Sequence, residues 1–235
     1  MIKEILMKLR VGKRLPLALI FAILAGCASD NIQEIEAGYD EDGGAGPVAM
    51  SYIDDVATDI RGQQGLLAIA RSDAELIHTH ASLAMQRAQD SDWVKMHAIH
   101  IRHTLAPASA ESGAVSSYGL LKAVNHVKDR VELAMEQNDA SDAIEFHGEQ
   151  ITLSADSVLE RGQQLLALAD QIIHAPRYSD LSGEAPKLVL LAEQILSGED
   201  LNGDGEISWE DNEPGLDQAM KYLDYLKEKE RAYGQ

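Results

Sequence analysis

An apolar pattern that repeats every seven residues is the strongest constraint on how this chain can fold. Four of its five members are followed, four positions later, by glycine or alanine. The apolar residues are Ile144, Ile151, Val158, Leu165 and Ile172, and the small ones are Gly148, Ala155, Gly162 and Ala169. Such residues line one side of an α-helix, and the small ones let a second helix approach closely. The pattern predicts a long central helix over 141–173. A coiled-coil dimer is the alternative, but the chain supplies apolar helical partners of its own.

Shorter segments with helical spacing of apolar residues precede and follow this central helix. Helices are expected over 48–61, from a capping box at Ser72–Glu75 to about Gln89, from Ser91 to before Pro107, and over 117–137, 184–198 and 214–230. For the second of these, a start near Gln64 with a kink is the alternative. The sequence contains no alternating pattern typical of a strand. The predicted fold class is therefore all-α: a helical bundle domain over 48–235 that includes a helix–loop–helix over 184–231.

Residues 1–26 have the layout of a secretory signal peptide. Five basic residues precede a short apolar run, Leu15–Leu24, which is too short for a stable transmembrane helix. The sequence Leu24-Ala25-Gly26-Cys27 resembles the bacterial lipobox, and the resemblance implies that Cys27 is lipidated and becomes the new N-terminus. An ordinary secretory signal that contains a cysteine is the alternative. Because Asp does not directly follow Cys27, the resemblance implies an outer-membrane location facing the periplasm.

Residues 27–47 are rich in acidic residues and glycine, so a flexible tether is expected there. Removal of residues 1–26 takes away five basic residues and Glu4, which changes the net charge from −19 to −23. Such an acidic surface repels nucleic acid and anionic lipid. This charge fits what the lipobox resemblance implies, a cell-envelope protein held to a membrane by the acyl chains on Cys27 alone. A protein partner in the envelope fits this picture, but the sequence does not identify one.

The segment Asp200–Asp211 is the one place where the sequence indicates a ligand. It reads Asp-Leu-Asn-Gly-Asp-Gly-Glu-Ile-Ser-Trp-Glu-Asp. Calcium takes oxygen ligands from alternating positions of a short loop, and a glycine at the sixth position allows the sharp turn. The candidate calcium ligands are the side chains of Asp200, Asn202, Asp204, Ser208 and Asp211 and the backbone carbonyl of Glu206. We therefore expect a bound calcium ion.

The loop resembles an EF-hand, and its closing Asp211 is similar to that of dockerin-type loops. The resemblance covers the loop and its two flanking helices, and it is specific because five constrained positions coincide. Asp211 stands where an EF-hand usually has Glu, and its shorter side chain makes bidentate ligation harder. EF-hands of calcium sensors usually occur in pairs, whereas this chain has a single such loop. The resemblance therefore implies a structural calcium site. A separate resemblance to bacterial lipoproteins with EF-hand loops is carried by the segments His97–Leu105 and Tyr118–Lys122, and it implies no activity.

The eight histidines all lie between His78 and His174. On one predicted helix, His97, His100 and His103 follow each other at intervals of three. His80 and His147 lie beside apolar faces of other helices. Histidines from facing helices hold haem or transition metals in bundles, so His80, His97, His100 and His147 are candidate ligands. The alternative is half-buried histidines bonded to some of the many carboxylates. The sequence contains no Cys-x-x-Cys-His and no His-Glu-x-x-His motif, which argues against covalent haem and the commonest zinc protease site.

The sequence as a whole favours a non-enzymatic, calcium-binding lipoprotein of the cell envelope with a structural or partner-binding role. No nucleophile elbow or phosphate-binding loop supports an enzyme. The alternative function is a bundle that binds a transition metal or b-type haem through histidines, in redox chemistry, metal handling or sensing.

Overall fold

The computed structural model describes residues 43–57, 65–107, 118–209 and 211–233. All the regular secondary structure in this part of the chain is helical, so the all-α prediction is confirmed. The helices are α1 (Pro47–Ala57), α2 (Leu66–Gln86), α3 (Ser91–Leu105), α4 (Leu120–Met135), α5 (Asp142–His174), α6 (Ala185–Ser197) and α7 (Leu216–Tyr233). The predicted signal peptide, Cys27 and most of the predicted tether lie outside the described residues.

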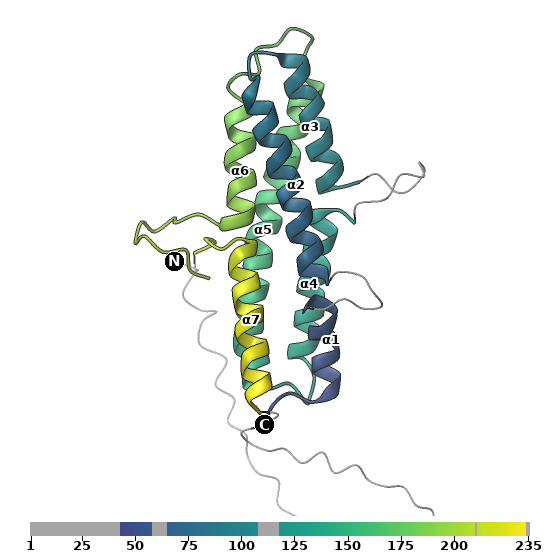
Figure 1. The fold of residues 1–235 in the computed structure, drawn as a ribbon, viewed down its shortest axis with the longest axis vertical. Coiled ribbons are helices and arrows are strands. Elements are labelled where there is room, and N and C mark those ends of the chain that lie inside the picture. Colours follow the sequence, from purple (N-terminus) through teal and green to yellow (C-terminus); the bar gives the residue numbers. More distant parts are fainter. Residues whose placement is uncertain (1–42, 58–64, 108–117, 210, 234–235) are drawn as a thin grey trace, which may run out of the picture. The chain divides into compact units, whose positions relative to one another are not determined.

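The helices form four columns in an up-down-up-down arrangement (Figure 1). α1 and α2 make the first column, α3 and α4 the second, α5 the third, and α6 and α7 the fourth. Three columns are therefore built from two helices each, and α5 forms the third column by itself. α2 also reaches both levels, because it packs against α3 and α6 at one and against α4 at the other. α5 packs against α3 and α6 at one level and against α4 and α7 at the other. The connection between α6 and α7 leaves the bundle near its middle.

The central helix follows the prediction closely. α5 has 33 residues and is about 50 Å long at about 1.5 Å per residue. Ser141 caps it by accepting a hydrogen bond from the backbone N–H of Ile144 at 3.1 Å. All five members of the seven-residue repeat are buried. A Cβ atom added to Gly148 would lie 2.7 Å from Sδ of Met135, and one added to Gly162 would lie 2.7 Å from Cδ2 of Leu121. The two glycines thus allow the close approach of α4.

The prediction that a helix starts at Ser72–Glu75 is wrong. α2 begins at Leu66 and continues through this segment, as the alternative start near Gln64 implied. Asp73 points its carboxylate away from its own helix and accepts a hydrogen bond from the N–H of Gly119 at 3.1 Å. An acidic residue inside a helix is therefore explained by a contact with a distant part of the chain.

The last residues of the predicted tether lie against the bundle. The N–H of Ala45 donates to Oε2 of Glu230 at 2.7 Å, and that of Gly46 donates to the carbonyl of Asp139 at 2.8 Å. The carboxylate of Asp139 in turn accepts from the N–H groups of Val48 and Ala49, at 2.9 and 3.1 Å. These bonds satisfy free N–H groups in the first turn of α1, so α1 starts where the chain meets the α4–α5 turn.

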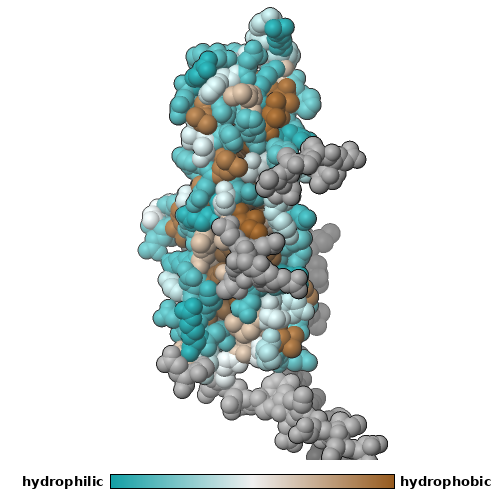
Figure 2. All heavy atoms as spheres, turned by 45° about the vertical axis from the view of Figure 1, so that its right-hand side comes forward, coloured by the Kyte–Doolittle hydropathy of each residue, from teal (hydrophilic) through white to brown (hydrophobic). Residues whose placement is uncertain are grey.

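The face of the protein shown in Figure 2 is mostly hydrophilic, with hydrophobic residues in small, separate patches. Among the helices described, none combines the length and the apolar composition needed to cross a membrane.

Candidate functional site

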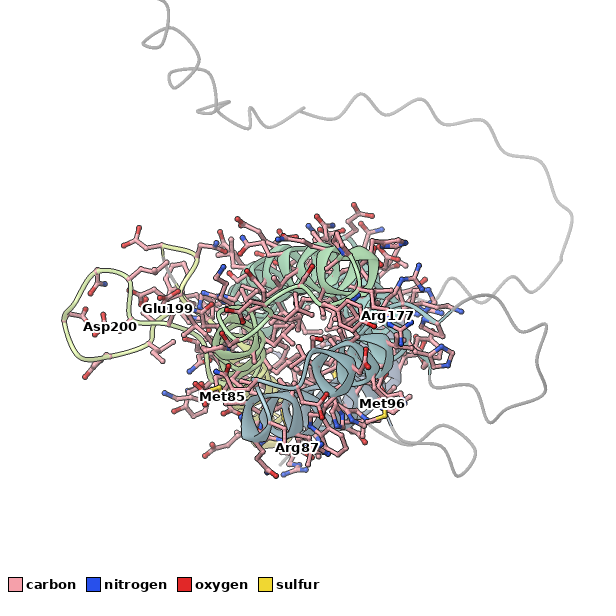
Figure 3. The ribbon with its side chains drawn as sticks, turned by 90° about the horizontal axis from the view of Figure 1, so that it is seen from above. Met85, Arg87, Met96, Arg177, Glu199 and Asp200 are labelled. Atoms are coloured by element: carbon pink, nitrogen blue, oxygen red, sulfur yellow. The ribbon has the colours of Figure 1, made fainter. Side chains whose placement is uncertain are left out.

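The predicted calcium loop projects from the side of the bundle between α6 and α7 (Figure 1). In the view along the bundle, Glu199 lies beside the helices and Asp200 lies well outside them (Figure 3). The base of this projection is narrow. The N–H of Glu199 donates to the carbonyl of Glu213 at 2.9 Å. A Cβ atom added to Gly215 would lie only 2.5 Å from the backbone nitrogen of Gly198. Two backbone segments therefore close the loop at its base.

The side chains of the first half of the loop turn inward and accept backbone hydrogen bonds. Asp200 accepts from the N–H groups of Gly203 at 2.6 Å and Gly205 at 2.9 Å. Asn202 accepts from Asp204 at 2.9 Å, and Asp204 accepts from Glu206 at 2.8 Å. Gly203 and Gly205 have φ values of +77° and +87°, which glycine adopts without steric cost. The glycine predicted to allow the sharp turn does so.

Sequence reasoning missed one carboxylate that holds the loop together, that of Glu213. This residue is 0% exposed. Its Oε1 accepts from the N–H groups of Leu201 and Asn202 at 3.2 and 3.1 Å, and its Oε2 accepts from the N–H and Oγ–H of Ser208 at 3.0 and 3.2 Å. The hydrogen bond from the Ser208 N–H is the main reason why the pKa of Glu213 lies below its usual value. The ionised carboxylate of Glu213 therefore accepts hydrogen bonds from both the first and the second half of the loop.

Glu213 lies outside the twelve-residue frame of the calcium pattern, so pattern matching does not point to it. The one signal in the sequence is an acidic residue directly before Pro214 and Gly215.

The helix that follows the loop starts slightly later than predicted. α7 begins at Leu216, two residues after the expected start at 214, and Asp211 lies in the loop. Asp211 has φ +54° and is exposed, and it lines a shallow hollow with residues of α5 that include Leu153 and Asp156. Pro214 and the left-handed backbone at Asp211 and Asn212 explain the late helix start, because neither continues an α-helix. Glu206 is exposed, and Ser208 is half-buried beside Glu213.

A buried arginine of α5 supports the base of the loop from below. Arg161 is 4% exposed. It donates to the carbonyl groups of Pro214 at 2.6 Å and Glu213 at 3.1 Å, and also to that of Asn212. Burial lowers the pKa of Arg161, although Glu199 and Glu160 oppose the shift. These three acceptors fix the end of the loop to the central helix.

The structure brings three of the four candidate histidines together near the α2–α3 end of the bundle. One ligand nitrogen each from His80, His97 and His100 lies within 4.8 Å of the others. Nδ1 of His80 lies 3.2 Å from Nδ1 of His97. His97 is buried, His80 half-buried and His100 exposed. Burial is the main reason why the pKa values of His80 and His97 are lowered, and His100 adds to the effect.

His147 does not join this group. Its Nδ1 contacts Oε1 of Gln150 at 2.9 Å, and its ring lies 5.9 Å from that of Tyr225 on α7. The length of α5 explains the separation. Arg102 of α3 pairs with Asp170 at 2.7 Å, so the α3 histidines lie beside the C-terminal end of α5. His147 lies more than twenty residues earlier, about 35 Å along the helix.

Comparison with known proteins does not indicate a function for this chain, so a function has to be inferred from the residues described above. No protein-family model, no curated protein and no solved structure matches the chain.

Proposed function

We propose that this protein is a calcium-binding, non-enzymatic protein of the cell envelope, anchored to a membrane by lipid on Cys27. The calcium site is the loop Asp200–Asp211 between α6 and α7. The observation that carries the proposal is the inward turn of Asp200, Asn202 and Asp204, each of which accepts a backbone N–H two to five residues later. A carboxylate or amide oxygen has two lone pairs, so accepting one N–H leaves capacity for a cation.

The charge of the loop supports a hard cation over other ligands. Asp200 and Asp204 lie in the same short turn, and Glu213 adds a buried, ionised carboxylate at its base. A calcium ion would offset the mutual repulsion of these groups. Calcium accepts oxygen ligands in flexible geometries, and sites of modest affinity suit the calcium levels outside the cytoplasm. Asp211 is the predicted closing ligand, and the carboxylate of Glu213 follows two residues later.

The ion would act as a structural staple. The base of the loop is already held by the Glu199–Glu213 backbone bond and by Arg161. A calcium ion would therefore stiffen a projection whose base is fixed, without moving α6 relative to α7. In this proposal the loop presents a rigid, calcium-dependent surface to an envelope partner.

Calcium should raise the thermal stability of the protein, and the Asp200→Asn/Asp204→Asn double variant should lose this effect. For dissociation constants of about 0.1–1 mM, calcium at about 10 mM stabilises the folded state by about 1.4 to 2.7 kcal/mol. This corresponds to a rise in Tm of about 3–10 °C. Thermal unfolding followed by circular dichroism, with calcium or with chelator, measures the shift.

The matched control is Asp180→Asn/Asp224→Asn, which removes two exposed carboxylates outside the loop. It should keep the full calcium-dependent shift. The loop assignment fails if both double variants respond to calcium as the unsubstituted protein does.

Cys27→Ser should release the protein from the membrane fraction. The reason is that acyl chains are the only anchor proposed, and serine cannot carry a thioether-linked lipid. Fractionation of cells that express the full chain, followed by detection of the protein in membrane and soluble fractions, measures the change. Metabolic labelling with a radioactive fatty acid should mark the parent protein alone. Equal membrane association of both proteins would show that Cys27 is not the anchor.

A further inference from the structure

The structure points to a second metal site, independent of the calcium loop, at His80, His97 and His100. We propose that these three imidazoles bind one divalent transition-metal ion of the zinc, copper(II) or nickel class, with at least one coordination position open to solvent. His80 comes from α2, and the other two come from α3. The inference does not rest on the proposed calcium function, because the two groups share no residue.

The distances between the rings suit one shared ion. Two nitrogen ligands about 2.0–2.1 Å from a tetrahedral metal ion lie about 3.3 Å from each other. The Nδ1 atoms of His80 and His97 are 3.2 Å apart. The ring centroids are separated by 5.4 Å for His80–His97, 4.7 Å for His80–His100 and 5.8 Å for His97–His100. His97 and His100 are three residues apart on one helix, which places them on neighbouring positions of its surface.

The same distances argue against haem, which the sequence left open. Two axial ligands on opposite sides of one metal ion lie roughly 4 Å apart, twice a metal–nitrogen bond of about 2 Å. The His80 and His97 nitrogens are closer than this. They are therefore placed as neighbouring ligands of one ion, not as opposite ones.

One ring nitrogen of the buried His97 has no hydrogen-bond partner within the described part of the protein. Nδ1 of His97 faces His80, and Nε2 of His97 is the one fully buried side-chain nitrogen or oxygen without a hydrogen-bond partner among the described residues. Buried polar groups in proteins almost always have a partner. A neutral imidazole has one nitrogen that donates and one that accepts, so a metal ion shared by the two Nδ1 atoms would use the accepting nitrogen of His97 and leave its proton on Nε2.

The surrounding residues hold the His97 ring in place. Trp93 contacts it edge-on, with ring centroids 4.6 Å apart. Trp93 is itself fixed, because its Nε1 donates to the carbonyl of Leu83 at 2.7 Å and Arg87 covers its ring at 4.4 Å. His97 is thus placed by packing before any ion arrives, which lowers the cost of assembling a metal site.

The donor set selects the class of metal. The group consists of three histidines without a carboxylate. Nitrogen ligands suit zinc, copper and nickel, whereas calcium and magnesium prefer oxygen. Burial lowers the pKa values of His80 and His97, which favours the neutral imidazole that binds a metal ion.

One side of the proposed site faces solvent. His100 is exposed and lies four residues after Met96, which points outward from α3 (Figure 3). Three protein ligands leave a tetrahedral ion with a fourth position for water or an external ligand. The proposed site can therefore load and release an ion without unfolding of the bundle.

The test is a titration of the full chain with cobalt(II) and zinc. All proteins carry Cys27→Ser, so that no free thiol competes for the metal. We expect one equivalent of cobalt to give the intense visible absorption of a four- or five-coordinate ion, and zinc to displace it. His80→Gln and His100→Gln should each weaken the affinity at least about 100-fold, beyond what is typical for the loss of a residue that only supports a ligand.

The matched control is His103→Gln, an exposed histidine on the same helix outside the group. It should bind cobalt and zinc as the parent protein does. The Asp200→Asn/Asp204→Asn variant should do so too, which separates this site from the calcium loop. Circular dichroism shows whether each variant is folded. If folded His80→Gln and His100→Gln proteins bind with parental affinity, or if the parent shows no specific equivalent, the proposal is overturned.

Discussion

Arg161→Met should destabilise the protein by about 3 kcal/mol or more. Methionine keeps most of the apolar stem but cannot donate to the carbonyl groups of Asn212, Glu213 and Pro214. A buried acceptor left without a partner costs about 1–3 kcal/mol. Two of the three hydrogen bonds are buried and the third is partly buried. Urea unfolding followed by far-UV circular dichroism measures the free energy of unfolding.

Arg102→Met is the matched control for this change. Arg102 pairs with Asp170 at 2.7 Å, but both side chains are at least 40% exposed. An exposed ion pair contributes at most about 1 kcal/mol, so this variant should remain close to the parent in stability. Equal losses in the two variants would mean that Arg161 does not hold the base of the loop.

Gly198→Ala should also cost about 3 kcal/mol or more. Gly198 has φ +83°, a conformation that costs a residue with a side chain roughly 1–2 kcal/mol. The added Cβ would also collide with the carbonyl oxygen of Glu213 and lie 2.7 Å from Cγ2 of Ile207. The first of these is a backbone atom in the closed base of the loop, so the collision cannot be relieved by rotation of a side chain.

The Gly203→Ala variant separates the cost of the positive φ from the cost of the steric collision. Gly203 has a similar φ of +77°, but a Cβ added there would meet no atom within 4 Å. It should therefore cost only the conformational part, roughly 1–2 kcal/mol. The difference between the two variants in thermal or urea unfolding reports the close contact at the base of the loop. A Gly198→Ala protein as stable as Gly203→Ala would show that the base is open in solution.

The sequence predicts a helix well where the apolar repeat of that helix alone determines its position. The repeat from Ile144 to Ile172 predicts α5 to within one residue at each end, because every second turn must bury one apolar side chain. The start of α2 was misread because Ser72 and Glu75 satisfy a capping pattern that the helix does not use. The arrangement of helices in stacked pairs was not predictable, since apolar spacing does not say whether two successive helices continue one column.

The candidate sites were also predictable only in part, because local patterns in the sequence do not show which distant residues come into contact. The turns at Asp200, Asn202 and Asp204 depend on hydrogen bonds a few residues apart, so the local pattern predicts them. Glu213 and Arg161 act across the loop and across the bundle, where the sequence gives no distance. The histidines show the same limit. Spacing on α3 predicts that His97 and His100 are neighbours. That His80 joins them and His147 does not depends on the level of the bundle at which each of these two histidines lies.

Calcium binding itself is tested most directly by equilibrium dialysis with radioactive calcium at about 0.15 M salt, where the acidic surface is largely screened. The protein and the Asp180→Asn/Asp224→Asn control should bind one more ion per chain than Asp200→Asn/Asp204→Asn. Because the two double variants have the same net charge, the difference does not arise from general attraction of cations. Equal binding by all three proteins would contradict the assignment of calcium to the Asp200–Asp211 loop.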